Sequence, residues 1–268
     1  MTQSLNAVYE SIDRQNADKP AATRRQIVAG AAATLGGMGL LGVAADADAA
    51  TVKGSRHSED PQTLLNVAAT AEVLATIANT VGAELFADEF DAVTLRNVRA
   101  AAREELVHYN VLTTALRARP VTKRIWIPND AVATPEAFLS TLEVGDQVFV
   151  NAYLLATTVF GNRGNGTAAR IAAEFMGVEA VHRALARQSL NKLGNDRVFM
   201  RFSQAETAPD APNQGTPGFR KALSHVTYLQ SLGFGFGAPG SKPGQFFDFD
   251  EVSQRTPTDP DLNTVTPL

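Results

Sequence analysis

The stretch Glu179-Ala180-Val181-His182 places a carboxylate and an imidazole three residues apart inside a long run of residues with helical periodicity. On a helix, this spacing puts both side chains on the same face, about one turn apart. The same spacing occurs at Glu105-Leu106-Val107-His108, again within a run that is typical of a helix. Two of the four histidines of the chain lie in these two units. Because a single Glu-x-x-His is common on helix surfaces, the pair has to be judged against the rest of the chain.

Four long stretches repeat apolar residues at intervals of three and four, which is the pattern of helices with one buried face. They run from Pro61 to about Val81, from about Val93 to Arg119, from Thr134 to about Phe160 and from Thr167 to about Leu190. Thr134 and Pro135 form a typical helix start, as capping residue and first helical residue. The breaks inside each pair of helices are short, whereas the connection at residues 120–134 is long and rich in proline. The sequence therefore predicts an all-α fold, a four-helix bundle at residues 61–195 with one long crossover.

Two pairs of acidic residues occupy matching positions on these helices. In an antiparallel helix pair, residues that are equidistant from the connecting turn lie at the same height along the bundle. Glu72 and Glu105 are equidistant from the break between the first two helices. Asp146 and Glu179 are equidistant from the glycine-rich turn between the last two. We therefore expect each pair to face one another, and the two halves of the bundle to repeat the same chemistry.

Together these relationships select four carboxylates and two imidazoles, which belong to Glu72, Glu105, His108, Asp146, Glu179 and His182. Inside an apolar bundle, four carboxylates repel one another and take up protons unless cations neutralise them. Two divalent metal ions would supply the balancing positive charge. Oxygen ligands with one imidazole per metal favour iron or manganese over magnesium, and a chain without cysteine offers no thiolate ligand. The sequence thus predicts a site for two iron or manganese ions.

With these motifs, the chain resembles the ferritin-like superfamily, in particular the exported bacterial ferritin-like domain proteins similar to plant desiccation-related proteins. The resemblance covers about residues 60–195, roughly half of the chain, and includes Leu64-Leu65-Asn66-Val67 ahead of Glu72 and Asn151-Ala152-Tyr153-Leu154 after Asp146. It implies terminal carboxylate ligands at Glu72 and Asp146, bridging carboxylates at Glu105 and Glu179, and imidazole ligands at His108 and His182.

Asp146 departs from the pattern, because the resemblance implies a glutamate at this position and aspartate is one methylene shorter. Its metal ion is then expected to be held loosely or through water. Glu143, one turn earlier, is the substitute if Asp146 points away. A different interpretation stays open, in which the acids are solvated or paired with Arg103 or Arg183.

Four further side chains have less specific roles. Tyr109 and Tyr153 lie near the expected ligands, either as core residues or as participants in electron or oxygen chemistry. Glu104 is expected on the outer face of its helix, exposed to solvent. His57 lies in a polar segment and is expected to be solvated.

The first 50 residues resemble a twin-arginine export signal. The paired arginines stand in Thr23-Arg24-Arg25-Gln26-Ile27-Val28, an uncharged run rich in Gly and Ala follows, and small residues alternate ahead of residue 50. The Phe that often follows the pair is an isoleucine here, and the later Lys is absent. We expect cleavage near Ala47 or Ala49, export through the twin-arginine machinery to the periplasm or the exterior, and a linker at residues 51–60. The alternative is a membrane anchor, for which the run is short.

Residues 196–255 are expected to form a C-terminal extension outside the four helices. It contains an apolar stretch from Phe219 to Leu232 that predicts a short fifth helix with His225, followed by an irregular segment of aromatic residues, glycines and acids. The aromatic rings either cover the open side of the bundle or form a surface for a partner or a homo-oligomer. The composition of residues 256–268, rich in Pro, Thr and Asp, predicts a disordered tail.

Composition narrows the class of function. A net charge of -4 and a pI near 5.6 argue against a nucleic-acid partner, since no basic excess is available to neutralise phosphates. The expected site favours either an enzyme that reduces oxygen or peroxide, ferroxidase-like or similar to manganese catalase, or a non-catalytic metal-binding or structural protein. Either would act in oxidative, metal or desiccation stress in the cell envelope. Iron storage in a cage is disfavoured, because a simple cage subunit has no place for the segment after residue 195.

Overall fold

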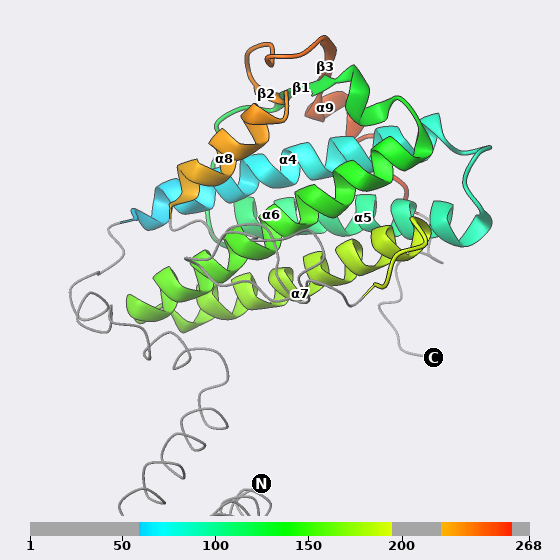
Figure 1. The fold of residues 1–268 in the computed structure, drawn as a ribbon. Helices are drawn as coiled ribbons and strands as arrows, with labels where there is room; N and C mark the ends of the chain where they lie inside the picture. Colours follow the sequence, from blue (N-terminus) through cyan, green and yellow to red (C-terminus); the bar gives the residue numbers. More distant parts are fainter. Residues whose placement is uncertain (1–58, 195–220, 259–268) are drawn as a thin grey trace, which may run out of the picture. The chain divides into compact units, whose positions relative to one another are not determined.

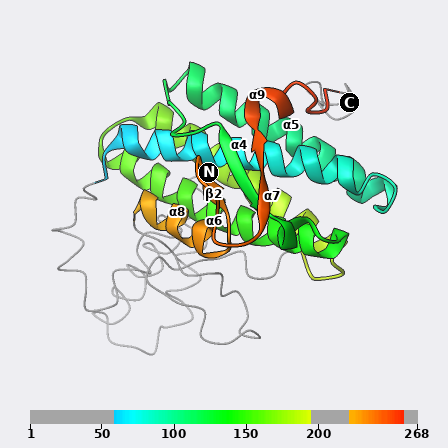
Figure 2. The ribbon, with the colours of Figure 1, turned by 90° about the horizontal axis from the view of Figure 1, so that it is seen from above.

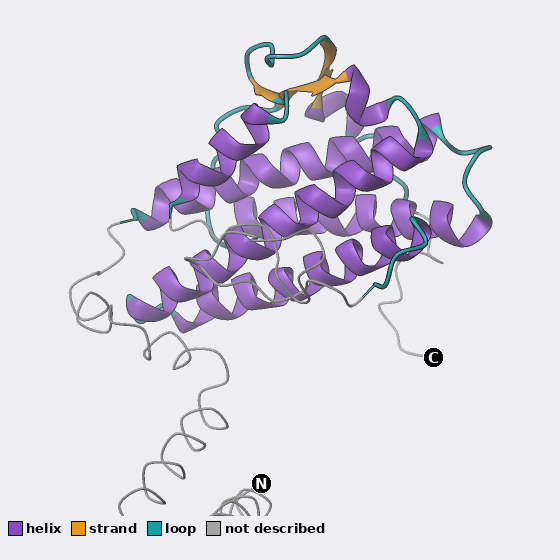
Figure 3. Cartoon of the chain, in the orientation of Figure 1, coloured by secondary structure: helices purple, strands orange, loops and turns teal. Residues whose placement is uncertain are grey.

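The computed structural model describes residues 59–194 and 221–258 of the 268-residue chain. Within them, helices make up most of the structure and a small sheet lies along one side (Figure 3). The predictions for the export signal, for His57 and for most of the linker and the tail fall outside the described residues. The same holds for residues 195–220 of the predicted C-terminal extension.

Four long helices form two antiparallel pairs, numbered as in Figure 1. They are α4 (Pro61–Leu85), α5 (Ala92–Thr114), α6 (Pro135–Asn162) and α7 (Gly166–Ser189). Helix α4 packs against α5 and α6 packs against α7, and the two pairs lie against each other, as both views show (Figures 1 and 2). The predicted four-helix bundle with one long crossover is therefore confirmed.

Each long helix begins at a side chain that caps its free backbone N–H groups. Asp60 accepts a hydrogen bond from the backbone of Thr63 at the start of α4, and Thr134 accepts one from Ala137 at the start of α6. Both helices then have proline in the first turn, where its missing N–H costs nothing. The start predicted at Thr134 and Pro135 is confirmed.

Helix α5 ends earlier than its sequence pattern predicted. The pattern carried the helix to Arg119, but the structure ends it at Thr114. Arg117 has a φ of 56°, in the left-handed region that interrupts a helix. The backbone N–H of Arg119 then donates to the side chain of Asn66 on α4, at 2.8 Å. This contact turns the chain across the bundle and starts the crossover.

Helix α4 is apolar enough to cross a membrane by length and composition, but 67% of its most apolar window is buried inside the protein. Such burial is the ordinary property of a core helix. Near its end, Gly82 makes room for the ring of Phe138 at the start of α6, since a Cβ at this position would come within 2.1 Å of the ring. This contact packs the end of α4 against the start of α6.

The crossover and the C-terminal segment form a three-stranded antiparallel sheet that the sequence analysis missed. Strand β1 (Arg124–Pro128) lies between β2 (Gly235–Phe236) and β3 (Gly244–Asp248). The expectation of irregular structure in the C-terminal segment is therefore wrong, and no strand was predicted in the crossover. Each strand is short, and the partners lie more than a hundred positions apart in the sequence, so no local pattern announces the pairing.

The C-terminal segment covers one side of the bundle. Helix α8 (Ala222–Ser231) packs on α4 and α6, within the stretch where a fifth helix was predicted. Phe234 and Phe249 are buried in the same apolar cluster as Val73 of α4 and Phe149 of α6. These two rings thus have the first of the two roles expected, that of covering the bundle. Phe249 begins a single-turn helix, α9 (Phe249–Val252).

The described structure continues past residue 255, where the tail was expected to begin. Thr256, assigned by composition to a disordered tail, is buried, and its hydroxyl lies 3.0 Å from that of Thr80 on α4. This contact anchors the end of the described C-terminal segment to the bundle.

His225 fixes α8 to the bundle in its neutral form. Its Nδ1 lies 3.1 Å from the carbonyl oxygen of Lys221, and its Nε2 lies 3.0 Å from the side-chain amide of Asn151 on α6. Burial is the main cause that lowers the pKa of His225 from 6.5 to about 4. A pKa that is lower in the folded than in the unfolded state stabilises the fold above pH 6.5, and this contribution is lost as the pH falls toward 4.

We therefore expect His225→Asn to make the metal-free protein less sensitive to acid. Between pH 7 and pH 4.5, the wild type should lose about 2–3 kcal/mol more free energy of unfolding than the variant does. Urea unfolding of both proteins with a chelator present, at both pH values, measures this difference. Equal losses in the two proteins would show that His225 is not the titrating group.

Candidate metal centre

The six residues selected by sequence lie in the interior of the bundle, and every long helix contributes at least one. They come from α4 (Glu72), α5 (Glu105 and His108), α6 (Asp146) and α7 (Glu179 and His182). The three glutamates are completely buried, and the other three side chains are at most 7% exposed. Buried acids without compensation are costly, so their partners decide what the site can do.

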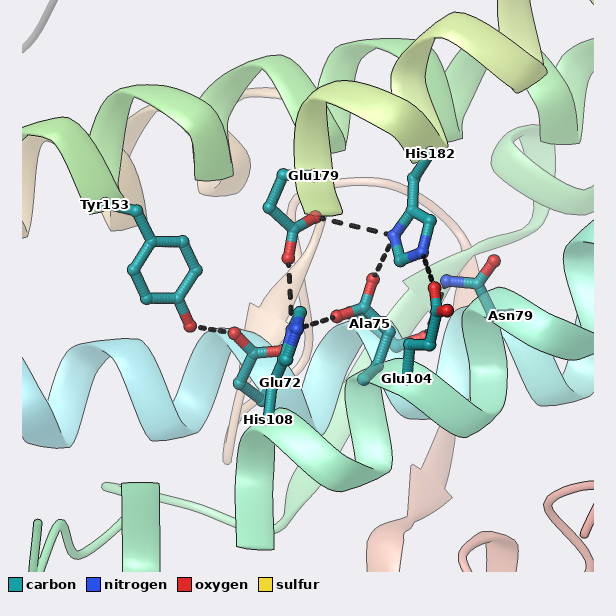
Figure 4. Close-up of polar contacts among 9 residues, drawn as sticks. Glu72, Ala75, Asn79, Glu104, His108, Tyr153, Glu179 and His182 are labelled. Carbon is teal, nitrogen blue, oxygen red and sulfur yellow. Dashed lines mark hydrogen bonds and ion pairs between the residues drawn. The ribbon is translucent and has the colours of Figure 1, made fainter. Parts of the chain in front are cut away.

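Four of these residues converge on one point. His108 Nδ1 lies 3.2 Å from Glu105 Oε2, 3.4 Å from Glu179 Oε1 and 3.6 Å from Glu72 Oε2 (Figure 4). One ligand atom from each of the four lies within 4.8 Å of the others. Three carboxylates and one imidazole around a single point form a donor set that suits a divalent cation.

His182 faces the opposite ends of two of the same carboxylates. Its Nδ1 lies 3.1 Å from Glu105 Oε1 and 3.8 Å from Glu179 Oε2. Each of these glutamates thus turns one oxygen toward His108 and the other toward His182, as Figure 4 shows for Glu179. Glu105 and Glu179 thus lie between the two imidazoles and contact both.

Asp146 lies outside the four-residue cluster but within its electrostatic field. Burial raises the pKa of Asp146 well above its ordinary value, and the charge of Glu179 raises it further, while His182 and Arg183 act in the opposite direction. Its Oδ2 is buried and has no hydrogen-bond partner. Asp146 therefore faces the His182 half of the site, with the buried Arg183 as a partial counter-charge.

Glu143 does not replace Asp146. Its carboxylate pairs with Arg187 and lies 2.6 Å from Lys192 Nζ, at the end of α7. Half-buried ion pairs of this kind hold the carboxylate away from the bundle interior. Glu143 was expected to act as a ligand only if Asp146 pointed away from the site, and this condition is not met.

The buried cluster is short of hydrogen-bond donors. Glu72 Oε2 and both oxygens of Glu179 are buried without a hydrogen bond of normal geometry. Burial and the charge of Glu105 raise the pKa of Glu72 to about 7. Burial opposes the charged form of both histidines, yet the surrounding carboxylates outweigh it and raise the pKa of His108 and of His182 well above 6.5. Buried carboxylate oxygens without hydrogen bonds, and ligand groups that hold protons because their pKa is raised, are properties of a site that fits metal ions.

Aromatic side chains border the half of the site that contains His108 and Glu72. The ring of Phe175 stacks on the ring of His108, with centroids 3.9 Å apart, and meets Tyr153 edge to face. The Tyr153 hydroxyl donates a hydrogen bond to Glu72 Oε1, which fixes that carboxylate (Figure 4). Tyr153 is thus both a core residue and a direct neighbour of a candidate ligand, whereas Tyr109 packs on Phe249 in the core.

Glu104 is the residue whose role the sequence analysis missed. Its side chain is 49% exposed, as expected, but its Oε2 lies 2.6 Å from Nε2 of His182 (Figure 4). A carboxylate on Nε2 of a histidine holds the Nε2 proton and leaves Nδ1 free to bind a metal ion. The signal in the sequence is a second acid beside a candidate ligand, on the edge of α5 that faces α7.

Replacing Glu104 with alanine should lower metal affinity by about 10–100-fold, because His182 would lose the partner that orients it. Glu104→Gln should recover part of this loss, since the amide oxygen can still accept the hydrogen bond. Competition with a chromogenic chelator measures the affinity. Asn110→Ala, at an exposed position of the same helix, is the control, and an equal loss there would contradict a specific role for Glu104.

A helical bundle with an interior cluster of glutamates and histidines defines the class of ferritin-like proteins. Comparison with protein families agrees, since residues 60–192 match the model described as a ferritin-like domain. The chain therefore contains a ferritin-like domain at residues 60–192. A search of curated proteins and a search of solved structures found no match.

Proposed function

We propose that the ferritin-like domain holds two ions of iron or manganese and reduces oxygen or peroxide. The observation that carries the proposal is the position of Glu105 and Glu179, each with one oxygen toward His108 and one toward His182. Both glutamates are completely buried, so a bridging role would explain acids that are otherwise poorly compensated.

In this proposal Glu72, with Glu105, Glu179 and His108, would hold one ion, and Asp146, with the same two glutamates and His182, would hold the other. Two such ions supply redox cycling between oxidation states and a place for oxygen or peroxide to bind. The chain's own residues set the geometry. Tyr153 holds Glu72 through its hydroxyl, and Glu104 holds His182 through Nε2.

The cellular setting is also part of the proposal. The paired arginines and the small-residue run in the first 50 residues support export by the twin-arginine route. Export in the folded state would let the metal ions bind before the protein leaves the cytoplasm. Location in the periplasm or outside the cell fits a role in oxidative, metal or desiccation stress.

Metal analysis of protein purified without chelator tests the proposal directly. We expect about two ions of iron or manganese per chain, and a loss of thermal stability when they are removed. Assays of peroxide decay and of ferrous oxidation on the loaded protein then separate the two kinds of turnover. Protein with no bound iron or manganese, and with unchanged stability after chelation, would end the proposal.

A second candidate is a metal-binding protein without turnover. The buried Arg183 favours it, because its charge already offsets part of the charge of Asp146 and weakens the need for a second ion. If this candidate is correct, we expect one ion per chain and no activity with peroxide or ferrous iron. The ion would be held by the cluster of His108 and three glutamates.

A further inference from the structure

A cavity of about 260 Å³ lies between the bundle and the C-terminal segment, bounded by α4, α6 and α8. Its wall is mostly apolar and includes Leu74, Ala78, Leu142, Phe149, Leu229 and Phe234. Helix α8 packs on both α4 and α6, and Figures 1 and 2 show it beside the bundle. A cavity of about 150 Å³ is large enough for benzene, so this one has room for a ring with a short alkyl chain.

The inner end of the cavity is polar and lies beside the candidate metal centre. Asn79 and Asp146 line it there. Both residues also line a smaller cavity of about 20 Å³, with room for about one water molecule, which His182 borders. The large cavity therefore ends at the His182 half of the site.

Asn79 has an unsatisfied acceptor in the wall beside this end. Its side chain is 2% exposed, and its Nδ2 donates to the carbonyl oxygen of Ala75 at 3.1 Å, which fixes the orientation of the amide. The Oδ1 atom is buried and has no hydrogen-bond partner. An unsatisfied buried acceptor costs about 1–3 kcal/mol, so a ligand that donates a hydrogen bond there would be favoured.

Two charged residues lie at the outer end of the cavity. Lys242 and Asp130 line the cavity and form an ion pair of 2.7 Å. The single tryptophan of the chain, Trp126, donates its ring N–H to the carbonyl oxygen of Lys242. The cavity is thus polar at both ends and apolar between them, which is the pattern of a site for a small amphipathic molecule.

We propose that this cavity binds a small apolar molecule with one hydroxyl group, such as an alkyl-substituted phenol, whose hydroxyl donates to Asn79 Oδ1. The alkyl part then lies among the side chains of α6 and α8. Binding itself needs no metal ion. The hydroxyl group of the ligand would lie beside Asp146 and His182. The inference that such molecules are organic substrates of the metal centre rests on the proposed function.

Gly145 offers a way to fill the cavity without disturbing the bundle. It lines the cavity on the same stripe of α6 as Thr141 and Phe149, and a Cβ added to it would meet no atom within 4 Å. Gly177 on α7 has the same open space but is exposed and does not line the cavity. Gly145→Leu and Gly177→Leu therefore form a matched pair, with the same gain in helix propensity.

Calorimetric titration of the full chain with 4-butylphenol and with butylbenzene tests the proposal, in metal-free and in metal-loaded protein. We expect 4-butylphenol to bind at least about fivefold more tightly than butylbenzene, which lacks the hydroxyl. Gly145→Leu should weaken binding of 4-butylphenol at least about tenfold, whereas Gly177→Leu should leave it unchanged. Asn79→Leu should remove the preference for the phenol.

Three results would overturn the proposal: no binding of either probe to the wild type, equal binding of the two probes, or equal affinity in Gly145→Leu and Gly177→Leu. Metal content, measured on the same samples, keeps this test separate from that of the proposed function. Phenol binding by a chain that takes up no metal supports the cavity and rejects the metal centre.

Discussion

Replacing Glu179 with glutamine should make the metal-loaded protein less stable and the metal-free protein more stable. Glu179 is completely buried, and neither of its oxygens has a hydrogen bond of normal geometry. In the metal-free protein it adds negative charge beside Asp146, whose pKa is raised by burial and then by this charge. Removal of the charge relieves that repulsion, while Glu105 still pairs with both histidines. We therefore expect a gain of about 1 kcal/mol in the free energy of unfolding.

The metal-loaded protein should respond in the opposite direction, because glutamine cannot bridge two cations as a carboxylate does. An ion present at 100 times its dissociation constant adds about 2.7 kcal/mol to stability, so loss of one ion should cost about that much. Urea unfolding with and without chelator, together with metal analysis, measures both effects. If the cluster had only a structural role, Glu179→Gln would change the stability in the same direction with and without chelator. That result would contradict a metal site.

Glu174→Gln provides the control for this experiment. Glu174 lies on the same helix, is 58% exposed and pairs with Arg170 at the surface. Exposed ion pairs of this kind contribute between zero and about 1 kcal/mol. The control should therefore leave metal content unchanged, and its small effect on stability should be the same with and without chelator.

The parts of the fold and site that could be predicted from the sequence are those that depend on helix geometry. Helical periodicity and the two short breaks determine which helices are antiparallel neighbours. That rule alone placed Glu72 against Glu105 and Asp146 against Glu179, and the mutual electrostatic effects within each pair agree with it. The Glu-x-x-His spacing then placed each histidine beside the glutamate of its own helix.

The parts that could not be predicted depend on contacts between distant segments. Strand β1 pairs with residues that follow it by more than a hundred positions, so its hydrogen bonds leave no local pattern. The contact of Glu104 with His182 crosses from α5 to α7 and depends on the rotamer of a half-exposed side chain. The burial of Asn79 could have been predicted from the sequence, because Asn79 follows Glu72 by two helical turns and lies on the same inward face of α4.

Metal binding should release protons, and more of them at pH 6 than at pH 8. Histidine and carboxylate ligands bind metal ions only after losing their protons. In the metal-free protein the pKa of Glu72 is about 7, and that of His108, of His182 and of Asp146 lies well above its ordinary value. Below pH 7 these groups hold protons that each incoming ion has to displace.

The sign of the effect follows from the direction of these shifts. A raised pKa means that the folded metal-free protein binds more protons than the unfolded chain, so this cluster stabilises it at low pH. That contribution is lost as the pH rises, for Glu72 from about pH 4.5 through 7 and for the histidines as the pH passes through their raised pKa values. Metal affinity changes in the opposite direction. It should fall at least about tenfold for each unit of pH below 7, because at least one proton is displaced per ion.

Calorimetric titration with manganese, in two buffers of different ionisation enthalpy at pH 6 and at pH 8, counts the protons released per ion. Glu72→Gln should release about one proton fewer at pH 6 and show no such deficit at pH 8, because a carboxyl with a pKa of about 7 is mostly ionised there. His225→Asn should leave the count unchanged, since its pKa of about 4 keeps it neutral at both pH values. Equal proton release at pH 6 and pH 8 would show that the ligand groups do not hold extra protons at pH 6. It would remove the strongest electrostatic reason for assigning metal ions to this cluster.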